Sequence, residues 1–574
     1  MGGDVRFGRK LVLPALFLGM TLVMLRPNPS ELANRLPGNT GDPALITWTL
    51  SWGAHTLPTH PTSYLNANIF WPHRGTLAYA DSLVPLAPAY AALYAATHSW
   101  PLTMLLLGVG LTVLSLSAAY ALGRWLTGRR DAAVLGAIAY TFSGFAVAQW
   151  GHVQLQTLGL LPLALLLLFR LLEEATVRRA LGLGLVSVAL VLSSLYYGLA
   201  YAVAVVVIVV AYVITRRGRL SPKVLGLLAL AAVVIAVLVW PELRARTRMS
   251  DEGFRRPLDP GFGLHGTDFL RPALRSYAWK PLEHAFGYRD EAHRFFSGAV
   301  AALLAVFGAV ATVGRRRTLR AKGMRLSPLA ALVAAGAVTG VLACGAKLGP
   351  FSGPFAFFYD HVPGFGQARV ASRLAVVTTL ALAMLAAAGF AALAARLGDR
   401  RSRVVAVIAG AVMLAEMAVA LPWADLAHDR ETLAVYRALA DRPAGAVVEL
   451  PMMIPRENSY RWAVVEAPRM VYSTLDWHPR VNGYSGFVPP GYDEDAAILD
   501  TFPEPAALQS AKEHGVRYVV LHLGTSQGYR LYSDDNAAAR LRSLPPGATA
   551  ERQGNSWLVD LGQILVTRTM RPSP

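Results

Sequence analysis

The side chains that could do chemistry lie in hydrophilic stretches between long apolar segments. The first of these stretches holds Asp42, inside "NTGDPALITWTLSW", and Asp81, inside "LAYADSL". A carboxylate can take the proton of a hydroxyl group while the hydroxyl oxygen attacks carbon, so either side chain could act as a general base. Asp42 and Asp81 are therefore the catalytic candidates.

A second group of side chains has the chemistry to bind an anionic, sugar-bearing substrate. Arginine binds phosphate with a planar, permanently charged fork. Arg369 and Arg373 are four residues apart, so on a helix they would share one face. The other members of the group are His73, Arg74 and Glu291. No spacing is typical of a metal site, so none is predicted, although the chemistry is compatible with a divalent ion.

Each of these side chains also has a purely structural interpretation. Asp followed by Pro is a common N-cap and N1 pair, so Asp42 would cap an interfacial helix whose tryptophans lie at headgroup level. Asp81 could cap the segment after it, and His73 and Arg74 could reach lipid headgroups. The interpretations are compatible, because a carboxylate can cap a helix and still face a cleft.

The composition is that of an integral membrane protein. Of 574 residues, 54% are hydrophobic and only 16% are charged, and the mean hydropathy is +0.39. The net charge of +18 comes from short basic clusters between apolar segments. Such clusters are typical of topology signals, so nucleic acid is not expected as a partner. The single cysteine, Cys344, excludes an intramolecular disulfide.

Eleven apolar stretches are long enough, or nearly so, to cross a bilayer, since a crossing needs roughly 20 residues. They lie at about 11–25, 101–122, 131–149, 153–170, 181–195, 197–215, 224–240, 297–314, 327–345, 374–395 and 404–422. With the N-terminus in the cytoplasm, the cytoplasmic connections are short and basic, as the positive-inside rule requires. They are "GRWLTGRRD", "RLLEEATVRR", "RRGRLSPK", "RRRTLRAKGMR" and "RLGDRRSR". A multi-pass protein of the cytoplasmic membrane is predicted.

The opposite face of the membrane receives the long segments. These are residues 26–100, 241–296 and 346–373, and everything after about 422. The predicted domains are therefore 1–422, spanning with outer loops, and 423–574, extracytoplasmic. In the second, "GAVVELP", "GVRYVVLH" and "NSWLVDL" are typical of strands and "PEPAALQSAKEHG" of a helix, which indicates a small α/β domain. The proline-broken stretch 83–97 is expected to be interfacial or re-entrant.

This combination resembles the GT-C superfold of membrane glycosyltransferases. The resemblance rests on a first helix followed by a long outer loop with an early Asp, and on many further helices. More narrowly, four stretches are similar to large GT-C-like bacterial membrane proteins. They are "GDPALITWTLSW", "NANIFWPHRGTLAYADSLVPLAP", "LGRWLTGRRDAAVLGAIAYTFSGF" with "HVQLQTLGLLPLALLLLFRLL", and the ending "VVELP", "RVNGYSGFVPP" and "HGVRYVVLH".

The resemblance implies a reaction. In the superfold the early loop aspartate is the proposed base, which carries over to Asp42 and then to Asp81, and the donor is a sugar on a polyprenyl phosphate. Arg369 and Arg373 match no motif of the superfold. The implied reaction is an inverting single displacement onto a glycan, lipid or protein acceptor of the cell envelope. A phosphate leaving group needs cationic stabilisation and no general acid.

Two other classes of function stay open. A transporter or lipid-linked-sugar flippase would carry ionisable residues inside its spans and two matched halves. Here the spans are nearly free of charge, with Glu416 as an exception, and no matched halves are visible. A non-catalytic assembly protein would tolerate replacement of its outer carboxylates.

Overall fold

The computed structural model describes residues 2–27, 32, 34–215, 220–285, 287–362, 364–427 and 429–562, with side chains from residue 12 on. The chain folds into two compact units. The helical unit comprises Met1–Asn28 and Leu106–Leu421, and the mixed unit comprises Pro29–Leu105 and Pro422–Pro574. The sequence places residues 26–100 with the spanning region. The contacts instead group this loop with the C-terminal residues.

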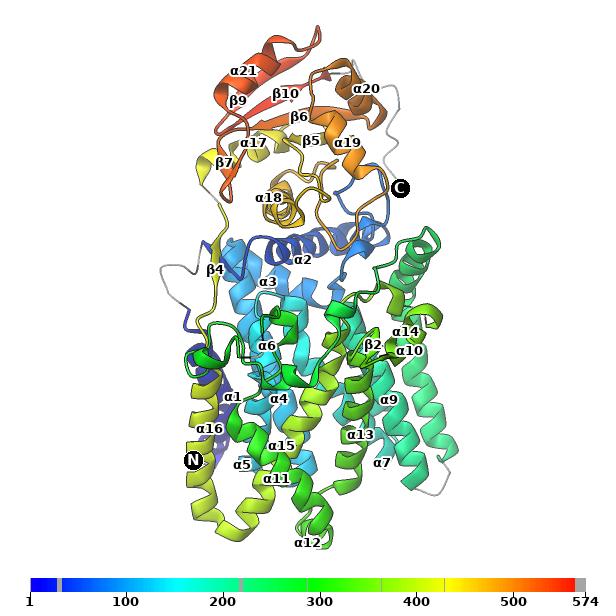
Figure 1. The fold of residues 1–574 in the computed structure, drawn as a ribbon, viewed down its shortest axis with the longest axis vertical. Helices are drawn as coiled ribbons and strands as arrows, with labels where there is room; N and C mark the ends of the chain where they lie inside the picture. Colours follow the sequence, from blue (N-terminus) through cyan, green and yellow to red (C-terminus); the bar gives the residue numbers. More distant parts are fainter. Residues whose placement is uncertain are drawn as a thin grey trace. The chain divides into compact units, whose positions relative to one another are not determined.

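The helical unit consists of long helices joined by short connections and loops (Figure 1). Its α-helices are α1 (Gly2–Leu25), α4 (Trp100–Thr127, shared with the mixed unit), α5 (Arg130–Thr141), α6 (Gly144–Ala148), α7 (Leu160–Glu173), α8 (Val177–Ser193), α9 (Leu195–Thr215), α10 (Pro222–Asp251), α11 (Ala299–Gly314), α12 (Arg316–Ala321), α13 (Leu326–Ala343), α14 (Pro354–His361), α15 (Val376–Leu397) and α16 (Asp399–Met417). Two two-residue strands, β2 (Lys347–Leu348) and β3 (Phe351–Ser352), form a small hairpin.

Six helical segments of the described residues are long and apolar enough to cross a membrane. They are Trp100–Thr127, Val153–Glu173, Leu195–Thr215, Pro222–Asp251, Leu326–Ala343 and Ala371–Leu397, and Val12–Leu25 and Ala299–Gly314 are shorter apolar helices. The chain is therefore a multi-pass membrane protein. The count of eleven crossings stays a prediction. One expected span, 131–149, is broken, because α5 ends at Thr141 and the hydroxyl of Ser143 caps the short α6.

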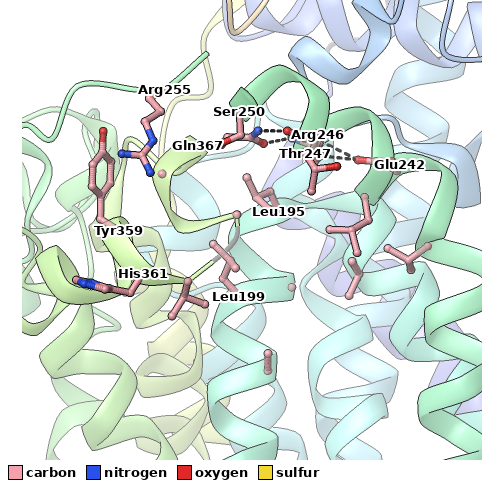
Figure 2. A pocket seen from close by; sticks show the side chains of 18 of the residues that line it. Leu195, Leu199, Glu242, Arg246, Thr247, Ser250, Arg255, Tyr359, His361 and Gln367 are labelled. Carbon is pink, nitrogen blue, oxygen red and sulfur yellow. Dashed lines mark hydrogen bonds and ion pairs between the residues drawn. The ribbon is translucent and has the colours of Figure 1, made fainter. Parts of the chain in front are cut away.

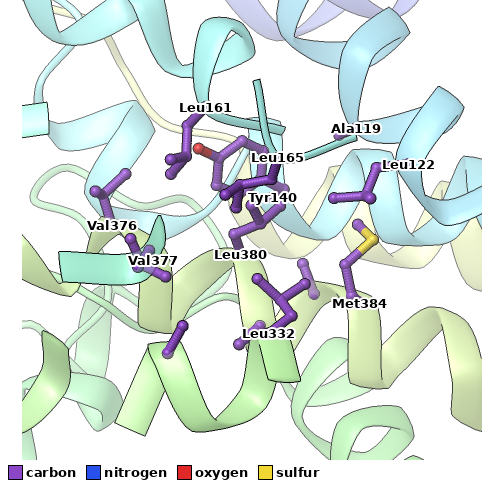
Figure 3. Packing of buried hydrophobic residues seen from close by; sticks show 14 of the residues in the cluster. Ala119, Leu122, Tyr140, Leu161, Leu165, Leu332, Val376, Val377, Leu380 and Met384 are labelled. Atoms are coloured by element: carbon purple, nitrogen blue, oxygen red, sulfur yellow. The ribbon is translucent and has the colours of Figure 1, made fainter. Parts of the chain in front are cut away.

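Helix α15 is buried along nearly its whole length and packs against α5, α11 and α13. Figure 3 shows Leu380 and Met384 of α15 among Tyr140, Leu165 and Leu332 of neighbouring helices. Gly308 of α11 and Gly389 of α15 lie against each other's helix backbone, so a Cβ at either position would collide with a carbonyl. Small residues at a helix contact allow this close approach in a membrane.

The exceptional charge in the last predicted span has a structural role. Glu416 of α16 accepts hydrogen bonds from the backbone N–H groups of Ala299 (3.0 Å) and Val300 (3.2 Å) at the start of α11. A carboxylate satisfies the unpaired N–H groups of a helix N-terminus and complements its dipole. Glu416 therefore does not indicate a transport path.

The mixed unit contains a four-stranded sheet with the order β5-β6-β10-β9. Strands β5 (Ala446–Leu450) and β6 (Val516–His522) are parallel, whereas β10 (Ser556–Asp560) is antiparallel to β6 and to β9 (Thr549–Gln553). The three strands predicted from sequence, and the helix α20 (Pro505–Glu513), are confirmed. This part also contains the helices α17 (Arg430–Ala440), α18 (Ser459–Tyr472), α19 (Tyr492–Leu499) and α21 (Asp534–Arg542). It has two further short strand pairs, β1 (Arg35–Pro37) with β4 (Trp423–Asp425) and β7 (Thr525–Ser526) with β8 (Tyr529–Arg530).

Helix α2 (Asp42–Thr59) belongs to the mixed unit, where it packs against α18 and α3 (Ala87–Thr97). Its side chains are buried on most of its surface, and the indole N–H groups of Trp48 and Trp52 donate to Asn68 and to the Tyr64 carbonyl. The prediction that these tryptophans lie at headgroup level is therefore wrong, because both side chains are buried within the mixed unit. The stretch 83–97 forms a short 3-10 turn and α3, which at 11 residues is too short to cross a bilayer.

Candidate functional site

One polar cluster of the helical unit forms where a loop before α11 meets the turn before α15. The loop contains the 3-10 helix Glu291–His293, and the turn contains the 3-10 helix Ala371–Ala375. The Ser372 hydroxyl donates to the carbonyl of Ala292 at 2.9 Å and fixes the two segments to each other. This contact brings the predicted residues Glu291 and Arg373 into one cluster.

Asp290 and His293 form a hydrogen-bonded pair in this cluster. The carboxylate of Asp290 lies 2.6 Å from Nδ1 of His293 and also accepts a hydrogen bond from the N–H of Ala292. Desolvation raises the pKa of Asp290, but the hydrogen bond with His293 and the charges of His293 and Arg373 outweigh it and hold the pKa below its ordinary value. Asp290 is therefore negatively charged at neutral pH.

Glu291 is the neighbouring carboxyl, and its environment raises its pKa, whereas the pKa of Asp290 is lowered. Burial raises its pKa, an effect that the positive charges of His152 and Arg275 only partly offset. Two adjacent carboxyls thus bind protons with different strength. Such a difference is typical of sites that combine charge stabilisation with hydrogen-bond donation.

Arg373 supplies the cation of the cluster. Its guanidinium carbon lies 4.9 Å from the centre of the Tyr196 ring, and the Tyr196 hydroxyl accepts the N–H of Val370 at 3.2 Å. Nε of Arg373 and Nε2 of His293 are buried and have no hydrogen-bond partner among the described residues. Buried polar groups in proteins are nearly always hydrogen-bonded, so both atoms are candidates for contact with a ligand.

Arg369 does not join Arg373 on a helix face, and that prediction is wrong. The backbone at Ala368 is extended, α15 begins only at Val376, and Arg369 is exposed with its guanidinium 4.9 Å from the ring centre of Phe262. The four-residue spacing therefore falls on a loop. The two arginines stack on different aromatic rings.

A cavity of about 480 Å³ lies in the same unit, between α9, α10 and the segment around α14. Its walls are apolar and come from helices long enough to cross a membrane, with Leu195, Leu199 and Ala202 from α9 and Val239 and Leu243 from α10. Figure 2 shows Leu195 and Leu199 of α9 below Arg246 and Gln367, with Tyr359 and His361 to their left. The volume is in the range of small-molecule sites.

The mouth of this cavity carries charges of both signs. Arg246 is paired with Glu242 at 2.8 Å and donates to the amide oxygen of Gln367 at 3.3 Å (Figure 2). Arg255 is exposed, lies over the ring of Tyr359 at 5.7 Å, and has no carboxylate partner among the described residues. Asp251, Asp360 and His361 also line the mouth. A ligand with both an anionic group and hydroxyl groups would match this mixture.

Asp42 lies in the mixed unit at the first position of α2, with Gly41 as the N-cap. Because Gly41 and not Asp42 is the N-cap residue, the predicted N-cap position is wrong by one residue. Oδ1 of Asp42 accepts a hydrogen bond from the hydroxyl of Tyr484 at 2.5 Å. The Tyr484 ring contacts Trp462 of α18 edge to face, with ring centres 4.7 Å apart. A half-buried carboxylate is thus held by a positioned phenol. Asp42 lines none of the three described cavities, all of which belong to the helical unit.

The other predicted residues of the first loop are also in the mixed unit. Asp81 lies between two 3-10 helices, Thr76–Tyr79 and Val84–Leu86, and the second of these has Leu83 as its N-cap without a side-chain cap. His73 and Arg74 are exposed in the turn after Phe70. Three or more histidine, cysteine or carboxylate side chains placed to hold a metal ion do not occur in the part of the chain that the structure describes.

No family model and no curated protein matches the sequence. Among solved structures, the arabinofuranosyltransferase AftD from Mycobacteria matches with a TM-score of 0.57 at 15% identity, over 96% of this chain. The chain spans 40% of the length of AftD. The Archaeoglobus fulgidus oligosaccharyltransferase also matches, with a TM-score of 0.47 at 13% identity, over 89% of this chain and 69% of that chain. ArnT from Cupriavidus metallidurans matches with a TM-score of 0.44 at 13% identity, over 98% of this chain and 100% of that chain. The fold is that of the GT-C membrane glycosyltransferases.

Within this GT-C fold, several residues of the described site were not singled out from the sequence. Tyr484 stands 442 positions from Asp42, so no local pattern links the two. Arg246 and Gln367 are 121 positions apart, and Arg246 lies beyond the predicted end of its span at 240. Only the length of α10, which continues to Asp251, could have indicated a polar extension of the helix.

Proposed function

We propose that the protein is a glycosyltransferase that moves a sugar from a polyprenyl-phosphate donor to an acceptor of the cell envelope, outside the cytoplasmic membrane. The observation that supports this most is the cavity between α9 and α10, in a chain with the GT-C fold. Its apolar walls suit an isoprenoid chain. Its mouth offers Arg255 to a phosphate, and Glu242, Asp251 and Gln367 to sugar hydroxyls.

The proposed reaction is a single displacement with inversion at the anomeric carbon. The carboxylate of Asp42 takes the proton of the acceptor hydroxyl as its oxygen attacks. The bond from the anomeric carbon to the phosphate oxygen breaks, and the electron pair leaves with the phosphate. Arg255 neutralises the developing charge, in keeping with its place among the residues that line the cavity and with a guanidinium that has no carboxylate partner among the described residues. No general acid is needed, because the phosphate is already a weak base.

The Tyr484 hydrogen bond should set the acidity of the proposed base. A hydrogen bond to the ionised form of a carboxylate stabilises that form, and such a bond contributes roughly 1.5–3 kcal/mol. Tyr484→Phe removes this hydrogen bond from Asp42. The acid limb of the pH profile of kcat/KM should then move to higher pH.

The matched control is Tyr460→Phe, since Tyr460 lies on α18 with 58% of its surface exposed. Its pH profile should equal that of the wild type. An acid limb that stays in place in Tyr484→Phe, with only a uniform loss of rate, would mean that Tyr484 does not act through the acidity of Asp42.

A bulky side chain in the cavity tests the donor site. Ala202→Trp places an indole among the apolar walls and should raise the KM for a polyprenyl-phosphate sugar by about tenfold or more, since tenfold corresponds to only about 1.4 kcal/mol. Initial rates in nanodiscs, measured against donor concentration, give this value. Val206→Trp is the control, because Val206 lies on the same helix, is 62% exposed and does not line the cavity. Equal KM values for both variants would exclude this cavity as the donor site.

A further inference from the structure

A second cavity, of about 320 Å³, lies at the other end of the helical unit. Figure 1 shows α12 at that end, away from α14. The cavity is lined by the last residues of α7 and α9 and the first residues of α13. All three belong to segments long and apolar enough to cross a membrane. Because the spans end here, the cavity is at the depth where lipid headgroups meet acyl chains.

The inner walls of this cavity are apolar. They are formed by Phe169 and Leu172 of α7, Ile208 and Ala211 of α9, and Ala331 of α13. Phe169, Leu172, Ile208 and Ala331 are buried in the helical unit. A small hydrophilic ion would leave these walls without a partner. An acyl chain would cover them.

The rim is basic. The connection 315–325, "RRRTLRAKGMR", holds five arginines and one lysine and no acidic residue. Arg325 is fixed by Glu173, with both carboxylate oxygens 2.6 Å from Nη1, and by the ring of Trp125 at 4.6 Å. Arg320 also lines the cavity, is exposed, and its guanidinium has no carboxylate partner among the described residues. The charge of Arg320 is therefore available to an anion.

We infer that this cavity binds an anionic phospholipid, with one acyl chain between α7, α9 and α13 and the phosphate at Arg320. Basic pockets between membrane-spanning helices are suited to such headgroups. The hydroxyl groups of the headgroup can accept hydrogen bonds from Arg325 beside its pair with Glu173. The site is separate from the proposed donor cavity, so it concerns the lipids that surround the enzyme and not its substrate.

The experiment is native mass spectrometry of the full-length protein, exchanged into micelles that contain graded amounts of phosphatidylglycerol or phosphatidylcholine of equal chain length. The wild type should retain one phosphatidylglycerol in preference to phosphatidylcholine. Arg320→Gln should weaken this retention about fivefold, the effect expected for one basic residue near a lipid surface. Arg317→Gln is the control, since Arg317 lies in the same connection but does not line the cavity.

A second pair of variants tests the apolar part without a change of charge. Ala211→Trp and Ala331→Trp fill the cavity from facing helices and should each abolish the preference for phosphatidylglycerol. A melting temperature close to the wild-type value in phosphatidylcholine shows which variant is folded. Equal losses in Arg317→Gln and Arg320→Gln would overturn the proposal in favour of diffuse attraction to the basic connection. Retention in a folded tryptophan variant, or competition by inorganic phosphate alone, would overturn the acyl-chain site.

Discussion

Replacing Asp42 by Asn should reduce the rate of sugar transfer by about 10²–10⁴-fold, with little change in the amount of folded protein. Asparagine keeps the size and the hydrogen bond with Tyr484 but cannot accept a proton. Because the N-cap of α2 is Gly41, the helix should keep its N-cap residue in the variant. Single-turnover rates of purified protein in nanodiscs measure the effect on the chemical step.

Asp535→Asn serves as the control, because Asp535 is an exposed carboxylate of α21 in the same unit. It should transfer sugar at the wild-type rate. Full activity of Asp42→Asn would move the base elsewhere, and Asp81→Asn would be the next variant. Loss of activity in both Asp42→Asn and Asp535→Asn would indicate a general effect of charge.

Replacing Arg480 by Met should lower the stability of the mixed unit by about 3–5 kcal/mol. Arg480 is buried, with Nε 2.8 Å from Glu449 and Nη2 2.6 Å from Asp476. Its removal leaves two buried carboxylates without their main counter-charge. Hydrogen exchange of the amides of β5 and β6, in the full-length protein, measures the free energy of opening.

The acidity of Glu449 shows how much this network favours its charge. Burial raises the pKa of Glu449, but the hydrogen bond with His522 and the charges of Arg480, His522 and Arg469 lower it to about 2. Its contribution to stability is therefore fully present above the unfolded pKa near 4.5 and is lost as the pH falls toward about 2. In Arg480→Met this loss should begin at a higher pH.

Arg442→Met is the matched control, since Arg442 and Glu551 form an ion pair in which both side chains are about two-fifths exposed, at 38% and 41%. Exposed pairs contribute roughly 0–1 kcal/mol, so the exchange rates should hardly change. Similar losses for the two variants would mean that burial does not decide the effect. The Arg480 network would then not be essential for the sheet.

The sequence predicts the multi-pass character of the helical unit, because a crossing helix is marked by roughly 20 apolar residues between basic connections. It does not predict the break at Phe142 and Ser143, since that stretch is as apolar as a continuous helix. Three strands of the mixed unit, β5, β6 and β10, are also predicted, from short runs bounded by glycine, proline and asparagine. The position of α2 is not predicted, because its tryptophans pack against protein, whereas the same sequence pattern would also suit a membrane surface.

The site is predicted only in part for a similar reason. Residue types identify Glu291, Arg373 and Asp42 as candidate site residues, and the structure places Glu291 and Arg373 in one polar cluster. Spacing along the chain is informative only inside regular elements, so the helical argument for Arg369 does not hold in a loop. Partners such as Tyr484 are brought to Asp42 by the tertiary fold, which no local pattern encodes.

Product formation by the wild-type protein in proteoliposomes distinguishes a glycosyltransferase from the other two classes of function. A panel of labelled polyprenyl-phosphate sugars is supplied together with a cell-envelope extract as acceptor. We expect at least one sugar to move to the acceptor with inverted anomeric configuration, while an equal amount of polyprenyl phosphate is released. If folded protein leaves every label on the lipid, the result contradicts the proposed glycosyltransferase activity and favours a non-catalytic assembly protein. If the label only changes leaflet, a flippase is favoured.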